Sequence, residues 1–346
     1  MRLKSKDIAA ALGISPATVS MALNGRQGVN DKTKQKILEY VKQQTDAQAQ
    51  QMQSEKCSCK GTVMMLVYIK NGRILERHAE RMDYTDQIES AVKQKGFRFY
   101  FKIFYEHTGQ LQSLIQECRQ LDLKGIYIMA AEMQKADIFP FLELGIPIVV
   151  GDNLFYEKGI DSYLIDNAEG IKRGVDYLVD KGHSHIVYLA EDTDIFNFNE
   201  RRAAFVEEME KRKCGDASRR IRRLGDGADK IYESMCRYLD GGIYKVTAFV
   251  LESDEVSLGV SKALMERQFQ IGCSISLIGF DLVPLFCIPK LQLTLIKGTH
   301  SRRHLDGIKH LMERICDENE EIMKVYYRTH FLEGNSVFDK KQYIYT

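Results

Sequence analysis

The first 45 residues place apolar positions at helical spacing, between polar residues that favour the starts and ends of helices. A short helix is predicted over residues 5–12, and Gly13 ends it because glycine readily takes the left-handed conformation of a sharp turn. A second helix is predicted over residues 15–24, with a serine cap and Pro16 in the first helical position. A third covers residues 31 to about 44. Two short helices at a glycine turn, with a third as brace, predict a helix-turn-helix unit.

The second helix of such a unit lies in the major groove of DNA. Its outward positions predict base-edge contacts from Pro16, Ala17, Ser20 and Met21, and phosphate contacts from Thr18, Ser20 and Asn24. The predicted DNA-binding set is completed by Lys6, Ser15 and Thr33. A three-helix bundle used for protein contacts would show the same pattern, so the pattern alone leaves that alternative open.

From residue 61 onward, apolar runs of strand length alternate with amphipathic helices, which predicts parallel βαβ units. The first series has strands at 62–69, 97–105, 125–129 and 146–150, with helices at 84–95, 110–121 and 136–144. The second has helices at 170–181, 199–213 and 255–267, with strands at 186–190, 248–251 and 276–280. The predicted fold is an all-α head followed by an α/β body of two Rossmann-like lobes.

Polar residues follow several of the predicted strands. Asp152, Asp254 and Asp281 come at or just after strand ends, and Arg201 lies in the first turn of a predicted helix. Ligands of such folds bind outside the carboxyl ends of the strands, so these side chains are candidates to converge on a polyhydroxylated ligand. An aspartate after a strand also commonly caps the next helix, which is the alternative at each position taken alone.

Charge is spread unevenly along the chain. Residues 1–45 hold eight lysines or arginines against three acidic residues, a net charge of +5, whereas the whole chain carries +1. A basic head on a mildly acidic body predicts that the head meets a polyanion.

No run approaches 18 apolar residues and the start has no apolar stretch behind its positive charges, so we expect a cytoplasmic protein without a membrane partner.

Catalytic and metal-binding patterns are weak. The eight cysteines are scattered apart from Cys57 and Cys59, which favours reduced thiols. His183 and His185 form an H-x-H pair, but a step from glycine to histidine more often ends a helix before a strand. No G-x-S-x-G, P-loop or H-E-x-x-H motif occurs. We therefore expect no cofactor, no metal and no enzymatic activity.

The head resembles that of the lactose-repressor (LacI) family of bacterial regulators. The resemblance rests on the run Asp7-Ile-Ala-x-x-Leu-Gly-Ile-Ser-x-Ala-Thr-Val-Ser-x-x-Leu-Asn24, followed by Val29-Asn-x-x-Thr33. It implies a homodimeric repressor that reads a pseudo-palindromic operator in double-stranded DNA. Met21 stands where most members carry arginine, so an apolar contact replaces a possible bidentate bond to guanine, and we expect an altered operator preference.

The body resembles the family's effector domain, which is similar to periplasmic sugar-binding proteins. The matching segments are Gly145-Ile-Pro-Ile-Val-Val-Gly-Asp152, Asp166-Asn167, Gly182-His183-x-x-Ile186, Arg201-x-x-x-Phe205, Ser253-Asp-x-x-x-x-Gly259 and Ile278-Gly-Phe-Asp281. The resemblance implies that Asp152, Arg201 and Asp281 bind an effector, possibly a carbohydrate. The predicted pocket is completed by Asp254, Phe198 and Asn71, and the absence of tryptophan leaves any sugar stacking to tyrosine or phenylalanine.

The predicted organisation has three parts: a DNA-binding head over 1–45, a linker over 46–60 and a two-lobed body over 61–346. Lobe 1 is expected at about 61–160 with 297–325, and lobe 2 at about 161–296 with 326–346. The linker lacks the family's usual Gly-Tyr-x-Pro-Asn stretch and its leucine wedge, which leaves a divergent hinge helix, a flexible tether or a weakened coupling device. The functional alternatives are a regulator controlled by a protein partner and, more weakly, an enzyme.

Overall fold

A computed structural model gives the structure of the chain as two compact units, Met1–Lys60 and Gly61–Thr346. It describes residues 9, 11–15, 18–19, 30, 33, 36–37, 59–72, 84–157, 159–212, 217–281, 291–317 and 321–344. None of the described helices is long and apolar enough to cross a membrane.

The first unit has the predicted turn between two helices. Gly13 lies in the left-handed region with φ of 68°, and the amide of Ile14 donates to the carbonyl of Ala9 at 3.1 Å. Ser15 then starts the second helix, because its Oγ accepts a hydrogen bond of 3.1 Å from the amide of Thr18. The glycine turn and the serine cap are confirmed.

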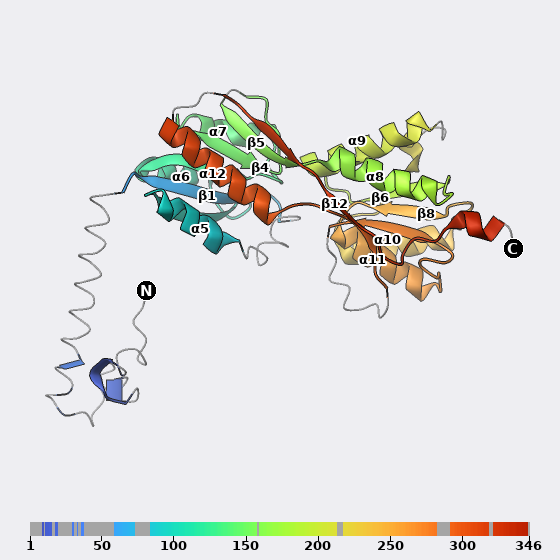
Figure 1. Cartoon of the computed structure of the whole chain (residues 1–346), viewed down its shortest axis with the longest axis horizontal. Coiled ribbons are helices and arrows are strands. Elements are labelled where there is room, and N and C mark those ends of the chain that lie inside the picture. The colour runs from blue at the N-terminus through green and yellow to red at the C-terminus, as the bar shows by residue number, and fades with distance from the viewer. Residues whose placement is uncertain are drawn as a thin grey trace. The chain divides into compact units, whose positions relative to one another are not determined.

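Lobe 1 is built, in the described part of the chain, on a six-stranded parallel sheet with the order β11-β5-β4-β3-β1-β2. Its strands are β1 (Thr62–Ile69), β2 (Arg98–Tyr105), β3 (Leu123–Met129), β4 (Ile148–Gly151), β5 (Ile160–Ile165) and β11 (Lys324–Tyr327). Helices α5 (Thr85–Gln94) and α12 (Ser301–Asp317) pack on one face, and α6 (Leu111–Gln120), η2 (Lys135–Ile138) and α7 (Phe139–Leu142) on the other (Figure 1). Because both faces are covered, β1 is buried along its whole length and reads as one apolar run.

Lobe 2 repeats this arrangement, with the strand order β12-β10-β9-β8-β6-β7 among the described residues. Its strands are β6 (Ile186–Ala190), β7 (Ile221–Arg223), β8 (Ala248–Leu251), β9 (Ser276–Phe280), β10 (Thr294–Lys297) and β12 (His330–Leu332), of which β12 runs antiparallel to β10. Helices α8 (Asn167–Asp180) and α9 (Phe196–Lys211) cover one face, and α10 (Ala228–Asp240) and α11 (Asp254–Glu266) the other. The short helices are η3 (Ala217–Arg220) and η4 (Lys340–Ile344).

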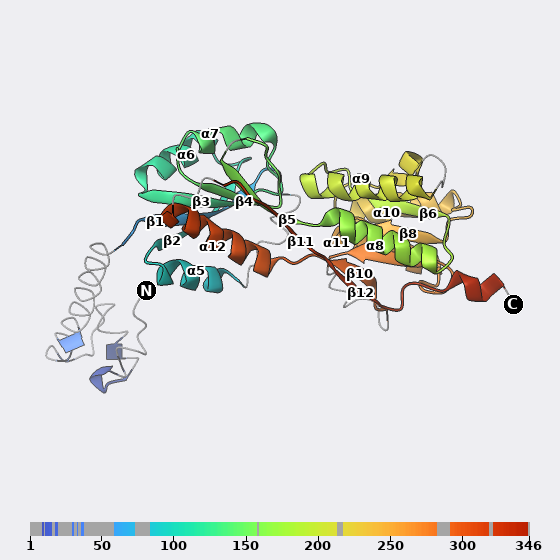
Figure 2. The same cartoon turned by 45° about the horizontal axis from the view of Figure 1, so that its top comes forward.

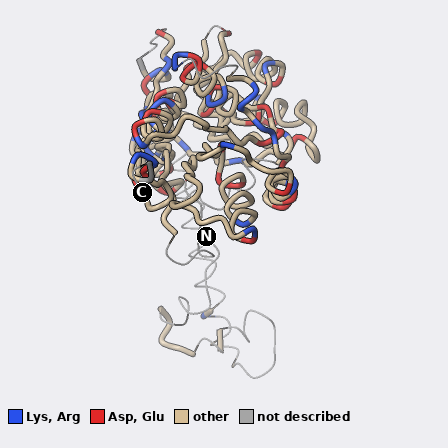
Figure 3. The backbone as a smooth tube through the Cα atoms, turned by 90° about the vertical axis from the view of Figure 1, so that its right-hand side faces the viewer, with Lys and Arg blue, Asp and Glu red and all other residues tan. Residues whose placement is uncertain are grey.

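Three crossovers connect the two lobes, from β5 to α8, from β10 to α12 and from β11 to β12, and Figure 2 shows them passing between the sheets. They are bonded to one another. The amide of Asp166 donates to the carbonyl of Tyr327 at 2.9 Å, and Thr299 Oγ1 donates to the carbonyl of Arg328 at 3.3 Å. Along the backbone of the body, the positions of lysine and arginine are interspersed with those of aspartate and glutamate (Figure 3).

The first crossover lies after residue 165, not near the predicted 160. All of β5 belongs to lobe 1, where it pairs with β4 and β11. Its polar residues Asp161 and Ser162 are fully buried. Because they interrupt the apolar run, the sequence pattern does not predict a strand here. Asp161 binds the amide of Met323 at 2.6 Å and Arg314 Nη1 at 2.5 Å, which ties β11 and α12 to β5. The later crossovers also fall slightly beyond their predicted positions, since β10 extends to 297 and β11 to 327.

Candidate functional site

Asp152 and Asp281 follow directly after β4 and β9, at the carboxyl ends of the two sheets. Both take left-handed backbone conformations, with φ of 67° and 64°, which non-glycine residues rarely adopt. Their amides hold them there: Asp152 donates to the carbonyl of Tyr163 at 3.2 Å, and Asp281 to that of Ile296 at 2.8 Å. Backbone strain at two equivalent strand ends is typical of a functional site.

Arg201 is 3% exposed and donates through two sides of its guanidinium group. Its Nε donates to Asn167 Oδ1 at 2.9 Å, and its Nη1 to the carbonyl of Glu252 at 2.7 Å. Nη2 lies 3.6 Å from Asp281 Oδ2, an ion pair beyond hydrogen-bond distance. The predicted position in the first turn of a helix is wrong, because α9 begins at Phe196 and places Arg201 in its second turn.

Two aromatic rings flank this guanidinium group. Its central carbon lies 3.4 Å from the ring centroid of Phe280 and 5.5 Å from that of Phe198. Cation–π attraction and loss of water at such a site hold the arginine in one orientation. Phe198 itself is buried, so it lies against Arg201 as a wall rather than as an exposed stacking platform.

Asp281 is bound by the crossover segment that follows β10. The amide of Gly298 donates to its Oδ1 at 3.0 Å, and His300 Nε2 lies 3.1 Å from the same atom. Burial alone would raise the pKa of Asp281, but His300, Arg201 and the Gly298 amide outweigh burial and hold the pKa well below its usual range. Asp281 is therefore an ionised acceptor.

Asp152 is bound in lobe 1 by a fully buried arginine. Arg303 Nη1 lies 2.8 Å from Asp152 Oδ1, and Arg303 has no exposed surface. From lobe 2, Asn197 Nδ2 reaches the same oxygen at 3.4 Å. Burial raises the pKa of Asp152, but Arg303 outweighs it, and the pKa lies below its ordinary value. Asp152 is thus a second ionised acceptor, already partnered from both lobes.

His304, next to Arg303, lies beside this ion pair as a neutral imidazole. It is 1% exposed, its Nδ1 lies 2.7 Å from the hydroxyl oxygen of Tyr127, and it stacks on Tyr84 with 5.4 Å between centroids. Burial and the charge of Arg303 lower its pKa well below the ordinary value. At neutral pH this residue supports the position of Arg303 without adding charge.

Behind Arg201, a second buried ion pair fixes α9 against the end of β8. Arg202 donates to both carboxylate oxygens of Glu252 at 2.7 Å, and its Nη1 donates to Asp194 at 2.7 Å. Burial raises the pKa of Glu252 to about 7, although Arg202 opposes the shift. Because Arg202 is held in this way, the neighbouring Arg201 has a fixed backbone.

The remaining predicted effector residues lie at other strand ends. Asp254 opens α11 after a serine cap, and its Oδ1 accepts from the amide of Glu255 at 3.0 Å. Asn71 follows β1, and its backbone N–H donates to Glu132 Oε2 at 2.9 Å. The contacts above join Arg201, Phe198 and Asp281, and Asp152 is linked to Arg201 through Asn197 and Asn167, since Asn167 Nδ2 donates to Asn197 Oδ1 at 2.9 Å. Asp254 and Asn71 have the separate partners just given.

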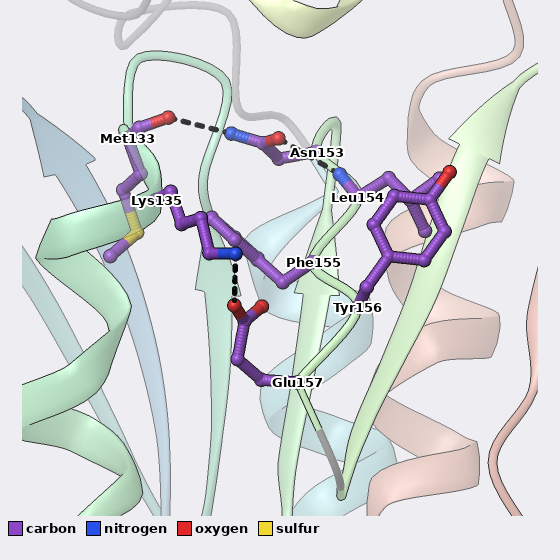
Figure 4. Close-up of a pocket in the computed structure, with 7 residues that line it drawn as sticks. All are labelled: Met133, Lys135, Asn153, Leu154, Phe155, Tyr156 and Glu157. Carbon is purple, nitrogen blue, oxygen red and sulfur yellow. Dashed lines mark hydrogen bonds and ion pairs between the residues drawn. The ribbon is translucent and has the colours of Figure 1, made fainter.

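A surface pocket of about 190 Å³ opens in lobe 1 (Figure 4). Its lining comes from the segments after β3 and β4, namely Met133, Lys135, Asn153, Leu154, Phe155, Tyr156 and Glu157. Asn153 closes the inner side by donating to the carbonyls of Ala130 and Met133 at 2.9 and 2.8 Å. Lys135 and Glu157 form an ion pair of 3.1 Å at the rim.

His183, one half of the H-x-H pair, is a core residue. Its Nδ1 lies 2.9 Å from Thr247 Oγ1 and its Nε2 lies 3.0 Å from Ser276 Oγ. Burial lowers its pKa. Among the residues that the structure describes, no group of three or more His, Cys, Asp or Glu side chains could hold a metal ion.

Only part of the predicted DNA-binding set falls within the described residues. Ser15 and Thr18 belong to the helix cap, where their hydroxyl oxygens also lie 2.8 Å apart. The amide of Thr33 donates to the carbonyl of Asn30 at 2.9 Å, as at a helix start. The other predicted contacts and most of the linker lie outside the described residues: Lys6, Pro16, Ala17, Ser20, Met21 and Asn24.

Comparison with known proteins matches both units. Residues 5–44 match the family described as bacterial regulatory proteins, lacI family, and residues 175–329 match the periplasmic binding protein-like domain. The chain is 24% identical over 329 residues to the HTH-type transcriptional repressor PurR of Mannheimia succiniciproducens, covering 93% of this chain and 95% of that protein. It is 21% identical over 336 residues to the probable HTH-type transcriptional repressor ExuR of Bacillus subtilis, covering 96% and 97%.

Solved structures agree on the fold. The transcriptional regulator CelR–cellobiose complex superposes with a TM-score of 0.68 at 18% identity, covering 97% of this chain and 100% of that one. The lac repressor dimer bound to operator and the anti-inducer ONPF gives a TM-score of 0.65 at 18% identity, covering 98% and 100%. At this identity the likeness establishes architecture, with a helix-turn-helix head and a two-lobed α/β body.

A head of this kind on a body of the periplasmic-binding-protein type defines a class of DNA-binding transcription regulators. Both parts occur here in the order that the class requires. The chain therefore joins a helix-turn-helix head of the LacI family of bacterial regulatory proteins to a periplasmic-binding-protein-like body, and it is similar to LacI-family regulators over nearly its whole length.

Proposed function

We propose that this chain is a transcriptional repressor whose affinity for its operator changes when a small polyhydroxylated molecule binds between the lobes of its body. The observation that carries the proposal is the meeting of Asp152, Asn197, Arg201 and Asp281 between the carboxyl ends of β4 and β9. This is where ligands of open α/β sheets bind.

The chemistry of these four residues suits hydroxyl groups. Asp152 and Asp281 accept hydrogen bonds, and Arg201 and Asn197 donate them, so together they match a ligand whose hydroxyls both donate and accept. The Phe280 ring adds an apolar wall beside Arg201. The CelR complex with cellobiose, a protein of the same fold, supports a carbohydrate as the ligand class.

On the DNA side, we propose a homodimer whose two heads read half-sites about one helical turn apart. The charge of +5 on residues 1–45 supports contact with phosphates. The lac repressor structure, a dimer on its operator, supports the same assembly. Met21 in the recognition helix would make an apolar contact with a thymine methyl group, whereas an arginine at this position would donate hydrogen bonds to guanine. This difference would change the preferred operator sequence.

We also propose the division into a head over 1–45, a linker over 46–60 and a body over 61–346, and the separation of units at residue 60 supports the last boundary. The similar proteins are named as repressors, which supports a regulator without catalytic activity. Because a repressor acts on the bacterial DNA, we propose that the protein lies in the cytoplasm.

The test is selection of genomic DNA fragments by the purified full-length protein at near-physiological salt, followed by sequencing. Recovery of one pseudo-palindromic site is the expected result. The truncated chain 61–346 is the control, since it lacks the head and should recover nothing. Uniform recovery that vanishes as salt rises would contradict a sequence-specific repressor.

The ligand is tested separately, by thermal unfolding of the full-length protein with a panel of neutral mono- and disaccharides. A ligand that binds only the folded body raises the unfolding temperature, and the rise grows with the logarithm of the ligand concentration once that exceeds the Kd. The expected shift disappears in Asp281→Asn. Silence across the panel, combined with selective DNA recovery, would instead favour control by a protein partner.

A further inference from the structure

The surface pocket of lobe 1 lies between the segment that follows β3 and the segment that follows β4, and we call it the β3–β4 pocket. It is lined by Met133, Lys135 and residues 153–157, none of which belongs to the proposed saccharide site. Its volume of about 190 Å³ is below the roughly 300–1,000 Å³ of pockets that hold drug-sized ligands. A ligand of this pocket is therefore a small metabolite.

Asn153 holds the two walls of the pocket together. Its Nδ2 donates to the carbonyls of Ala130 and Met133, and its Oδ1 accepts from the backbone N–H of Leu154 at 2.8 Å. The wall that follows β3 continues into η2, which begins at Lys135 behind a capping box. Because these bonds fix both walls, the pocket is preformed, and binding does not require a loop to be ordered.

Two charged side chains of opposite sign face each other across the pocket (Figure 4). Lys135 Nζ lies 3.1 Å from Glu157 Oε1, and the lysine side chain is 76% exposed whereas that of Glu157 is 15% exposed. Burial raises the pKa of Glu157, but Lys135 outweighs burial, and the pKa lies below its ordinary value. Glu157 is therefore ionised, and its exposed partner holds it only weakly.

The second carboxylate oxygen of Glu157 has no donor. Oε2 is buried, and it makes no hydrogen bond within the part of the chain that the structure describes. Withdrawing a carboxylate oxygen from water without a donor costs free energy, so buried polar atoms are nearly always paired. An N–H group bound in the pocket would supply the missing donor.

The rest of the lining is largely apolar. Met133 and Phe155 are each 5% exposed, whereas Tyr156 is 79% exposed and presents its ring at the edge of the pocket. Lys324 Nζ, from β11, lies 4.1 Å from the centroid of this ring, and cation–π attraction holds the two together. A ring with this much exposed surface can cover an apolar group bound beside it.

We propose that the β3–β4 pocket binds a free α-amino acid with an apolar side chain. The ammonium group donates to Glu157 Oε2, the carboxylate accepts from Lys135, and the side chain packs against Met133 and the Tyr156 ring. A zwitterion inserted beside this ion pair leaves neither of its charges without a partner, whereas an amine or an anion compensates only one. The site does not rest on the proposed function.

The test is titration calorimetry of the full-length chain at neutral pH and two temperatures, with L-valine, L-leucine and L-methionine. The tightest binder is compared with its analogues that keep only the carboxylate or only the ammonium group, which for leucine are isocaproate and isopentylamine. Binding at least tenfold weaker is expected for both analogues, and also for glycine, which lacks an apolar side chain.

Three outcomes of the titration overturn the proposal. Absence of binding by all three amino acids at millimolar concentration is the first. An analogue with only the carboxylate that binds equally well would mean a simple anion site at Lys135, and one with only the ammonium group a simple cation site at Glu157. This comparison uses the wild-type chain, so it does not depend on the folding of any variant.

Substitutions then locate the bound amino acid. Glu157→Gln should weaken binding at least tenfold, because a charge-assisted bond to the ammonium group is lost, and Lys135→Met should weaken it severalfold. Glu143→Gln is the matched control, since Glu143 is 70% exposed and belongs to another ion pair of lobe 1, with Arg119. Wild-type affinity in Glu157→Gln would overturn the proposed site.

Asp281→Asn separates this site from the proposed saccharide site. The variant should bind the amino acid as wild type does, although its saccharide response should be lost. Loss of amino-acid binding in Asp281→Asn would place the amino acid between the lobes and overturn the β3–β4 pocket. If no saccharide binds the wild type while the amino acid does, the ligand part of the proposed function fails and the pocket stands.

Discussion

Arg303 and Asp152 form an ion pair of 2.8 Å in which the arginine has no exposed surface. The pair joins the start of α12 to the end of β4. A buried ion pair contributes little net stability compared with an apolar pair, but removing one partner leaves an uncompensated charge in the interior. Asp152, a residue implied by family resemblance to bind ligand, therefore depends on an arginine from a distant part of the chain.

Arg303→Met should lower the free energy of unfolding at pH 7 by about 3–5 kcal/mol, because Asp152 would stay buried without its cation. Urea titration followed by circular dichroism measures this. Arg302→Met is the control, since Arg302 is 68% exposed and its pair with Asp306 should be worth less than about 1 kcal/mol.

The pH dependence of this variant supplies a second check. The pKa of Asp152 is lowered in the native state, so its contribution to stability is present at neutral pH and is lost as the pH falls. Without Arg303 this lowering disappears. The difference between wild type and Arg303→Met should therefore shrink toward acid pH; a constant difference would contradict the pairing.

The strands that the sequence predicts best are those buried on both faces. Ile186–Ala190, Ala248–Leu251 and Ser276–Phe280 have their predicted bounds, because a covered parallel strand requires an unbroken apolar run. The strand β5 is absent from the prediction because Asp161 and Ser162 interrupt such a run. Their burial depends on partners in α12 and β11, more than 150 residues away in sequence.

The same limit applies to the site. Asp152 and Asp281 are recognisable because they follow strands within resembling segments, and Arg201 because it lies in another such segment. Asn197 and Arg303 carry no local signal: one precedes a predicted helix, and the other lies in an amphipathic helix beyond the strongest resemblance. Only the pairing of distant segments brings them to Asp152.

Glu252→Gln should change how stability depends on pH. Burial raises the pKa of Glu252 to about 7 from an ordinary value near 4.5, so between these values the native state holds a proton that the unfolded chain has released. Stability from this residue therefore falls as the pH rises through that window, by up to about 3 kcal/mol at about 1.4 kcal/mol per pKa unit. Glutamine does not titrate and should remove this slope.

Unfolding free energies at pH 5, 6, 7 and 8 measure this slope. The absolute difference in stability between the two proteins is not informative, because glutamine also changes the hydrogen bonds to Arg202. Glu207→Gln is the control, since Glu207 is 66% exposed. Parallel pH profiles for wild type and Glu252→Gln would show that Arg202 keeps this carboxyl ionised throughout.

Ser15→Ala should loosen the second helix of the head. The Ser15 hydroxyl is the acceptor for the Thr18 amide, and loss of such a cap costs about 1 kcal/mol. Hydrogen exchange of the segment 11–19 in the full-length chain should become about fivefold faster. Ser15→Asp keeps an acceptor at the cap and should exchange as wild type does. Equal acceleration in both variants would show that the Ser15 hydroxyl does not stabilise the start of this helix.

Arg201→Lys should separate charge from geometry at the proposed ligand site. Lysine keeps the positive charge but cannot donate at once to Asn167 and to the carbonyl of Glu252, which Arg201 does through Nε and Nη1. Two buried acceptors lose their donor, so the free energy of unfolding should fall by about 1.5–3 kcal/mol, as urea titration measures.

In Arg201→Lys, the thermal shift caused by any active saccharide should disappear, whereas recovery of genomic fragments should persist because the head is unchanged. Arg219→Lys, at an exposed position of lobe 2, is the matched control. Wild-type stability in Arg201→Lys would show that charge alone suffices there, and a retained thermal shift would place the ligand away from Arg201.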